Sequence, residues 1–175
     1  MASQTFTKLG EIEHVLKRPD TFVGSLTKKK RMEYVVVDDS FHIEKKEIQI
    51  SKAFARIFIE PLSNCIDNVA VSRQNGIKVS KIHVSIDKET GETTFLNDGN
   101  YIPIEIHEEE KVYKHTLVFG HLRTSSNYDD DKVREDISGR NGYGIKLSNI
   151  FSTKFTVEAV DPKNGKILTQ TWENN

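Results

Sequence analysis

The feature that most constrains the fold is the helical periodicity of residues 54–69. Apolar side chains recur there every three or four residues, the spacing that puts them on one buried face of an α-helix. Pro61 lies inside this stretch and lacks the N–H that would bond to the carbonyl of Ile57, so we expect a kink there and not the end of the helix. The predicted buried face consists of Phe54, Ile57, Phe58, Leu62, Cys65, Ile66 and Val69.

Shorter predicted elements surround this helix. Strands are predicted where apolar and polar residues alternate, and turns where glycine, asparagine and aspartate cluster. The mixed order of helices and strands favours an α+β two-layer sandwich, with helices on one face of a mixed, mostly antiparallel sheet. The predicted helices are 11–16, 117–122 and 145–151, and the predicted strands are 32–37, 41–50, 81–86, 93–96, 155–160 and 167–172.

Composition excludes several classes of protein. The chain has 175 residues, enough for one domain, and its 25 basic and 26 acidic residues leave no overall positive field to hold DNA. Cys65 is the single cysteine, which excludes an intrachain disulfide framework and fits a reducing compartment. No apolar run has the length of a signal-peptide core or a membrane span, so we expect no secretion and no membrane partner.

A polar stripe runs along the central helix. Glu60, Asn64 and Asn68 recur every fourth residue and therefore lie one above another. The amide oxygen of Asn64 is a hard ligand that suits Mg²⁺, and Glu60 could orient and deprotonate a water molecule that attacks a phosphate. For the stripe alone, the solvent-exposed face of an amphipathic helix is the simpler interpretation.

Asn97, Asp98 and Gly99 follow a predicted strand. These residue types favour turns for conformational reasons, so a turn is the plain interpretation. A side chain held at such a bend could also contact the hydrogen-bonding edge of an adenine. The sequence leaves both interpretations open.

A glycine-rich loop runs from Ser138 into the last predicted helix. Its glycines allow the backbone to approach a phosphate, and the first N–H groups of the helix would face the anion. The loop is not a Walker A motif, because no Gly-Lys-Ser/Thr follows. It is not a dinucleotide fingerprint either, because the glycine spacing differs and no strand is predicted just before it. Upstream, Ser125, Ser126 and Asn127 offer donors for a ribose or a phosphate, and we interpret 129–131 as solvated carboxylates.

These segments, in this order, resemble the GHKL ATPases of the Bergerat fold, and within them the eukaryotic and large-DNA-virus branch of the type IIA DNA topoisomerases. The resemblance covers almost the whole chain and is most specific in the last two segments. It rests on residues 13–25, FARIFIEPLSNCIDN at 54–68, LNDGNYIPIE at 96–105, LVFGHLRTSSNYDDD at 117–131 and SGRNGYGIKLSNIFST at 138–153.

The resemblance implies ATP and Mg²⁺ as cofactors and a role for each motif residue. Glu60 would be the general base, Asn64 the magnesium ligand and Asn97 the adenine contact. Asn68 would line the nucleotide site, and Ser125, Ser126 and Asn127 would contact the ribose and phosphates. The lid around the triphosphate would consist of Gly139, Arg140, Asn141, Gly142, Tyr143, Gly144, Ile145 and Lys146.

The resemblance also implies an organisation and a biological setting. Residues 1–25 would form an N-terminal arm and first helix, and 26–175 the ATPase domain, with transducer and DNA-cleavage domains expected beyond this sequence. ATP would close a homodimer gate that traps one DNA duplex, with DNA bound mainly by the full-length enzyme. We expect such a protein in the nucleus or, for a viral source, in the host cell or virion.

Three residues depart from the pattern of the branch. Tyr101 stands where the second motif has a glycine, Pro61 stands between the base and the magnesium ligand, and Phe6 replaces a tyrosine. Two alternatives therefore stay open. One is another GHKL ATPase of the chaperone or mismatch-repair type, and the other is a nucleotide-gated dimerisation module with little catalysis.

Overall fold

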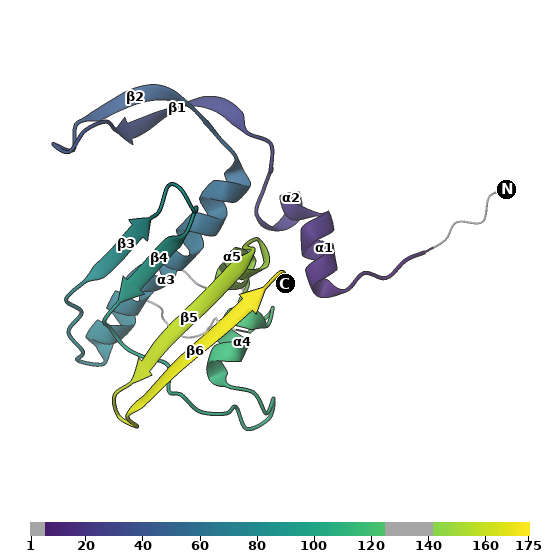
Figure 1. The fold of residues 1–175 in the computed structure, drawn as a ribbon, viewed down its shortest axis with the longest axis vertical. Coiled ribbons are helices and arrows are strands. Elements are labelled where there is room, and N and C mark those ends of the chain that lie inside the picture. The colour runs from purple at the N-terminus through teal and green to yellow at the C-terminus, as the bar shows by residue number, and fades with distance from the viewer. Residues whose placement is uncertain (1–5, 125–141) are drawn as a thin grey trace. The chain divides into compact units, whose positions relative to one another are not determined.

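The computed structural model describes residues 6–124 and 142–175. The chain divides into two compact units, Met1–Ile57 and Phe58–Asn175. Figure 1 shows the order of the helices and strands along the chain. The predicted division at residue 25 stays a prediction.

The first unit joins two short helices to a β-hairpin. Its strands pair in antiparallel register, with Val36 opposite Ile43 beside the turn. Val15 and Val23 are buried in this unit, and the ring of His14 meets that of Phe22 edge to face with 5.4 Å between their centroids. The elements of this unit are α1 (Glu11–Lys17), α2 (Pro19–Phe22), β1 (Lys29–Val36) and β2 (Ile43–Ile50).

The helix α2 is an addition to the predicted elements. The first predicted helix ends at residue 16, close to Pro19, because a residue before proline disfavours the helical conformation. The structure shows that Pro19 also begins the next helix. Its fixed φ and its missing N–H both suit the first turn of a helix, where that N–H would have no intrahelical partner.

The long helix α3 (Lys52–Gln74) carries the predicted polar stripe. Ser51 caps it, because the Ser51 hydroxyl accepts a hydrogen bond of 3.0 Å from the N–H of Phe54. The helix continues through Pro61, as predicted. Cys65 is buried, whereas Phe54 and Ile66 of the predicted buried face are exposed, so part of that face lies open to solvent.

The second unit contains the rest of α3, two hairpins and two short helices. The described strands of the chain form three separate two-stranded sheets. All three are antiparallel, as predicted, but no hydrogen-bonded ladder joins them into one sheet. The elements that follow α3 are β3 (Ile82–Ile86), β4 (Thr93–Asn97), α4 (Lys114–Gly120), α5 (Gly144–Ile150), β5 (Lys154–Asp161) and β6 (Lys166–Glu173).

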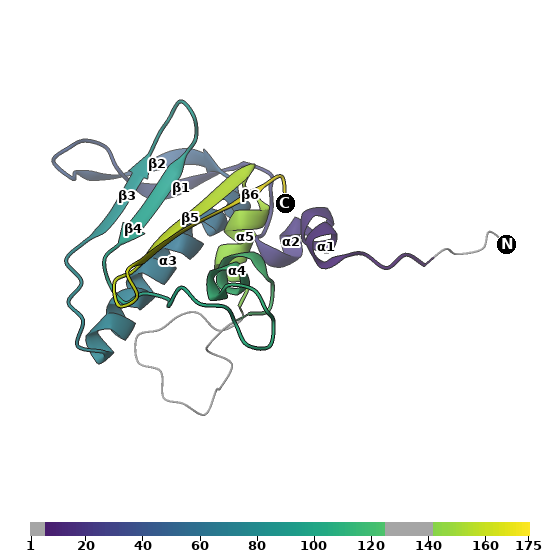
Figure 2. The same cartoon turned by 60° about the horizontal axis from the view of Figure 1, so that its bottom comes forward.

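In this unit the helices cover one face of the hairpins, as Figure 1 and the turned view of Figure 2 show. Phe58 of α3 contacts Phe95 of β4, with 5.2 Å between ring centroids. Phe119 of α4 lies 6.5 Å from Phe155 of β5, which in turn lies 6.0 Å from Trp172 of β6. These aromatic contacts pack α3 against β4 and α4 against β5.

Candidate functional site

Glu60 lies directly against the start of α5. A Cβ added to Gly144, the first residue of α5, would run into the Glu60 carboxylate, closer than real Cβ atoms approach other atoms. Only glycine leaves room for this carboxylate at the helix start. The fold thus brings together two predicted site residues, one from the first motif and one from the glycine-rich loop.

Asn64 is the next member of the stripe and its side chain is exposed. It stands one helical turn beyond Glu60, since α3 continues through Pro61. Among the described residues, no three His, Cys, Asp or Glu side chains are grouped to hold a metal ion. Mg²⁺ commonly binds through one or two protein ligands together with substrate phosphates and water, so a lone amide ligand at Asn64 would suit it.

Lys146 has a buried side chain in α5. Its Nζ donates a hydrogen bond of 2.5 Å to the carbonyl of Thr124. Burial lowers the pKa of Lys146 to about 8, because the charged ammonium loses hydration. An anion beside this side chain would raise its pKa again by favouring the charged form. Thr124, which the sequence pattern did not single out, directly precedes the predicted contacts at 125–127 along the chain.

The rest of the glycine-rich loop is only partly described. Gly142 takes φ +63, a left-handed conformation that favours glycine. Tyr143 precedes α5 without a side-chain cap, and Ile145 is buried, so any contact from Ile145 to a ligand falls to its backbone. The predicted site residues Ser125, Ser126, Asn127, Gly139, Arg140 and Asn141 lie outside the described residues.

Asp98 has a structural task that the sequence did not reveal. Its carboxylate accepts hydrogen bonds from the Ser80 hydroxyl and from the N–H groups of Ser80 and Lys81, the latter two at 2.9 and 3.1 Å. These bonds, the Ser80 hydroxyl first among them, lower the pKa of Asp98 to about 2. Asp98 thereby fastens the start of β3 and leaves Asn97, half-buried at the end of β4, as the candidate for adenine.

The side chain of Asn68 also contacts the turn that follows β4, at residues 97–100. Its Nδ2 donates a hydrogen bond of 2.8 Å to the carbonyl of Asn100. A Cβ added to Gly99 would strike the Asn68 amide oxygen, so glycine permits this approach too. The described parts of the predicted site therefore converge on one face of α3, from the turn after β4 and from the start of α5.

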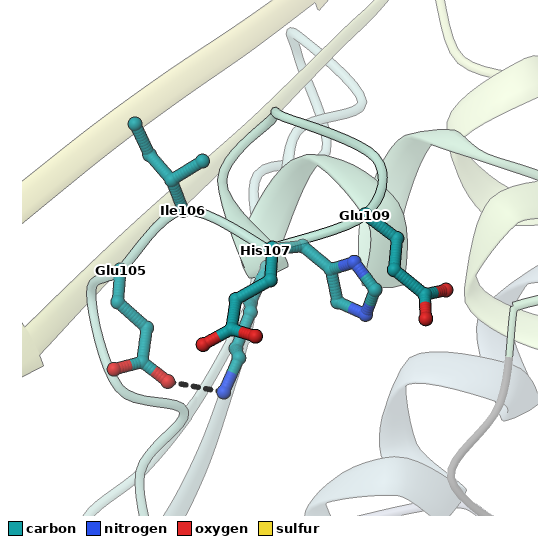
Figure 3. A pocket seen from close by; sticks show the side chains of 6 residues that line it. Glu105, Ile106, His107 and Glu109 are labelled. Carbon is teal, nitrogen blue, oxygen red and sulfur yellow. Dashed lines mark hydrogen bonds and ion pairs between the residues drawn. The ribbon is translucent and has the colours of Figure 1, made fainter.

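A separate hollow of about 370 Å³ lies in the loop between β4 and α4 (Figure 3). Glu105 and Lys114 form an ion pair at its edge. The surplus of carboxylates would repel a triphosphate, so this hollow is not a candidate for the nucleotide. It is lined by Glu105, Ile106, His107, Glu108, Glu109 and Lys114.

Known proteins resemble this chain in sequence and in structure. DNA topoisomerase 2 of Candida glabrata is 45% identical over 174 residues, which span 99% of this chain and 12% of that protein. The ATPase and transducer domains of DNA topoisomerase II from Balamuthia mandrillaris superpose with a TM-score of 0.92 at 40% identity, over 100% of this chain and 43% of that one. The chain is homologous to the ATPase region of DNA topoisomerase II.

This homology confirms the predicted family and the predicted GHKL-type α+β fold. DNA topoisomerase 2 of Invertebrate iridescent virus 6 is also similar, with 42% identity over 179 residues that cover 97% of this chain and 16% of that protein. No family model matches the chain. In the described part of the chain, no helix is long and apolar enough to cross a membrane.

Proposed function

We propose that this chain binds ATP with Mg²⁺ and hydrolyses it as the nucleotide-operated part of a type II DNA topoisomerase. The observation that carries the proposal is the contact between the Glu60 carboxylate and Gly144. Given this contact, a base at Glu60 would lie at the end of the loop that would hold the phosphates. The homology to an ATPase region points to the same chemistry.

Each described residue of the site then has a task. Glu60 orients the attacking water and accepts its proton, and Lys146 holds negative charge at the transferred phosphate. The amide oxygen of Asn64 would hold the magnesium ion, which when bound neutralises phosphate charge. Asn97 contacts the adenine edge, and the left-handed Gly142 lets the backbone of the lid approach the phosphates.

The wider setting belongs to the proposal as well. Ser125, Ser126 and Asn127 would contact the ribose and phosphates, and nucleotide binding would close a homodimer through residues 1–25. With a net charge of −1, this part of the protein contributes little to DNA binding. The DNA would be held mainly by the rest of the longer enzyme, in a nucleus or, for a viral source, in the host cell or virion.

Calorimetry tests the proposal. The wild-type chain is titrated with a non-hydrolysable ATP analogue, with magnesium and again after chelation of magnesium. We expect magnesium-dependent binding that Asn64→Ala weakens by about tenfold and that Gly142→Ala also weakens, because alanine disfavours the left-handed backbone. Asn75→Ala, an exposed change just beyond α3, is the matched control and should bind as the wild type does.

The magnesium dependence separates the two variants. Asn64→Ala should bind with the same affinity in the presence and absence of magnesium, whereas Gly142→Ala should keep the magnesium effect. Absence of binding by the wild-type chain would contradict the proposal, and so would equal losses in Asn64→Ala and Asn75→Ala.

A further inference from the structure

Ser72 lies on α3 one turn beyond Asn68, and no sequence motif marks it. We propose that Ser72 is a positioning residue for adenine recognition, which acts by fixing the turn at 97–100 onto α3. This inference rests on the proposed nucleotide site. In that site, Ser72 would fix the distance between the residues that contact adenine and those that contact the phosphates.

The hydroxyl of Ser72 is bonded in two directions. The residue is fully buried, with 0% of its surface exposed. Its Oγ donates a hydrogen bond of 3.0 Å to the Asn68 amide oxygen and accepts one of 2.7 Å from the N–H of Asn100. Since Asn68 Nδ2 donates to the Asn100 carbonyl at 2.8 Å, α3 holds both backbone polar groups of Asn100.

The hydrogen bonds that Asn68 and Ser72 make with the backbone of Asn100 form a clamp, and Gly99 makes this clamp possible. A Cβ at this position would meet the Asn68 amide oxygen, the Ser72 hydroxyl at 2.5 Å and Val79 Cγ2 at 3.0 Å. The turn therefore rests directly on the two side chains, and a larger residue would lift it off. On its other side, the Asp98 carboxylate is bonded to the backbone of Ser80 and Lys81.

The consequence for the site follows from what each end of the clamp carries. Asn97, the candidate adenine contact, begins the clamped turn, and Asn64, the candidate magnesium ligand, stands one turn before Asn68 on the same helix. The clamp thus sets the separation between the two ends of a bound nucleotide. Both ends of the Asn68 amide are engaged in it, so Asn68 acts on the nucleotide through the turn.

Three variants test the role of Ser72. Ser72→Ala removes only the hydroxyl, Ser72→Thr keeps it, and Ser51→Ala removes the hydroxyl that caps the other end of α3. For each protein, the affinity for a non-hydrolysable ATP analogue with magnesium is measured alongside the thermal midpoint. Hydrogen exchange at the Asn100 amide is followed without nucleotide.

We expect Ser72→Ala to weaken binding by about tenfold, the effect of about one lost hydrogen bond, and to speed exchange at the Asn100 amide. Ser72→Thr should restore affinity to within about twofold of the wild type, because it supplies the same donor and acceptor. Ser51→Ala should lower the thermal midpoint without weakening binding, because it lies away from the turn.

Several results would overturn the inference. One is wild-type affinity in Ser72→Ala, and another is unchanged hydrogen exchange at the Asn100 amide in that variant. A third is a loss of affinity that is proportional to the drop in thermal midpoint in both Ser72→Ala and Ser51→Ala. If the wild-type chain bound no nucleotide while Asn100 exchange still responded to Ser72→Ala, the proposed function would fail and the adenine role with it. The exchange result would then distinguish that failure from the absence of the clamp.

Discussion

The carboxylate of Glu60 occupies the space that a side chain at Gly144 would need. One residue belongs to the middle of the longest helix and the other begins a helix far along the chain. The contact joins the candidate base to the candidate phosphate loop, so a change at Gly144 should act on catalysis through the position of Glu60.

Gly144→Ala should reduce ATP turnover far more than stability. The added methyl group would meet the end of a flexible side chain, which can swing away at little cost in folding free energy. The displaced Glu60 would no longer align the water, and misplacement by about 1 Å can cost about 100-fold in rate. We expect turnover to fall at least about tenfold, as measured by phosphate release, with a small change in the midpoint of urea unfolding.

The control is Gly10→Ala, because no atom lies within 4 Å of a Cβ at Gly10. Turnover by Gly10→Ala should match that of the wild type. Full turnover by Gly144→Ala would show that the contact has no bearing on the position of the base.

Glu60→Gln should separate hydrolysis from binding. Glutamine keeps the shape of the side chain and its place beside Gly144 but cannot accept the proton of water at neutral pH. General-base catalysis contributes about 10²- to 10⁴-fold, so turnover should fall by at least about 100-fold. Affinity for a non-hydrolysable analogue should stay within a few-fold. Unchanged turnover would show that Glu60 is not the base, whereas tight binding without turnover by the wild type would favour the alternative of a nucleotide-gated dimerisation module.

The sequence predicted the elements better than it predicted their contacts. Periodicity depends on neighbours along the chain, and it located α1, α3 and all three hairpins within a few residues. Periodicity did not distinguish the covered edge of α3 from the open one. Phe54 and Ile66 were therefore predicted to be buried, whereas the structure exposes them. The coverage of a helix face depends on which distant segments pack against it.

The candidate site shows the same limit. Residue type and helical spacing made Glu60 and Asn64 candidates, and only the resemblance to the ATPases gave them their predicted roles. Ser72 gave no signal, since a serine near the end of a helix is ordinary and its task depends on the distant turn at 99–100. Asp98 was interpreted as a turn residue or part of an adenine contact, and its bonds to residues 80 and 81 emerge only from the folded chain.

Asp98 should make stability depend on pH in the acid range. Hydrogen bonds, first that from the Ser80 hydroxyl, lower its pKa from 3.8 to about 2 in the folded chain. The carboxylate therefore stabilises the fold above pH 3.8, and this contribution is lost as pH falls toward 2. The free energy of unfolding, measured with urea, should be higher for the wild type than for Asp98→Asn by a constant amount between about pH 5 and 7. This difference should shrink below about pH 4. A difference that did not change down to pH 2 would exclude this titration as the source.

Lys146 should change stability in the same direction in the alkaline range. Burial lowers its pKa from 10.5 to about 8, so between these values the unfolded chain holds a proton that the folded chain has released. The free energy of unfolding should therefore rise with pH across that window. Lys146→Met keeps an apolar stem and removes the titration. The stability of wild type relative to Lys146→Met should increase from pH 8 to 10, and a flat difference would contradict the lowered pKa.

The same side chain should bind a proton when nucleotide binds. At pH 8 about half of the Lys146 side chains are neutral, and an adjacent phosphate raises their pKa by favouring the charged form. Calorimetry of a non-hydrolysable ATP analogue in two buffers of different ionisation enthalpy measures this uptake. Relative to Lys146→Met, the wild type should take up about half a proton at pH 8 and close to none at pH 6.5, where Lys146 is already charged. Equal uptake by the two proteins at pH 8 would mean that the phosphates bind away from Lys146.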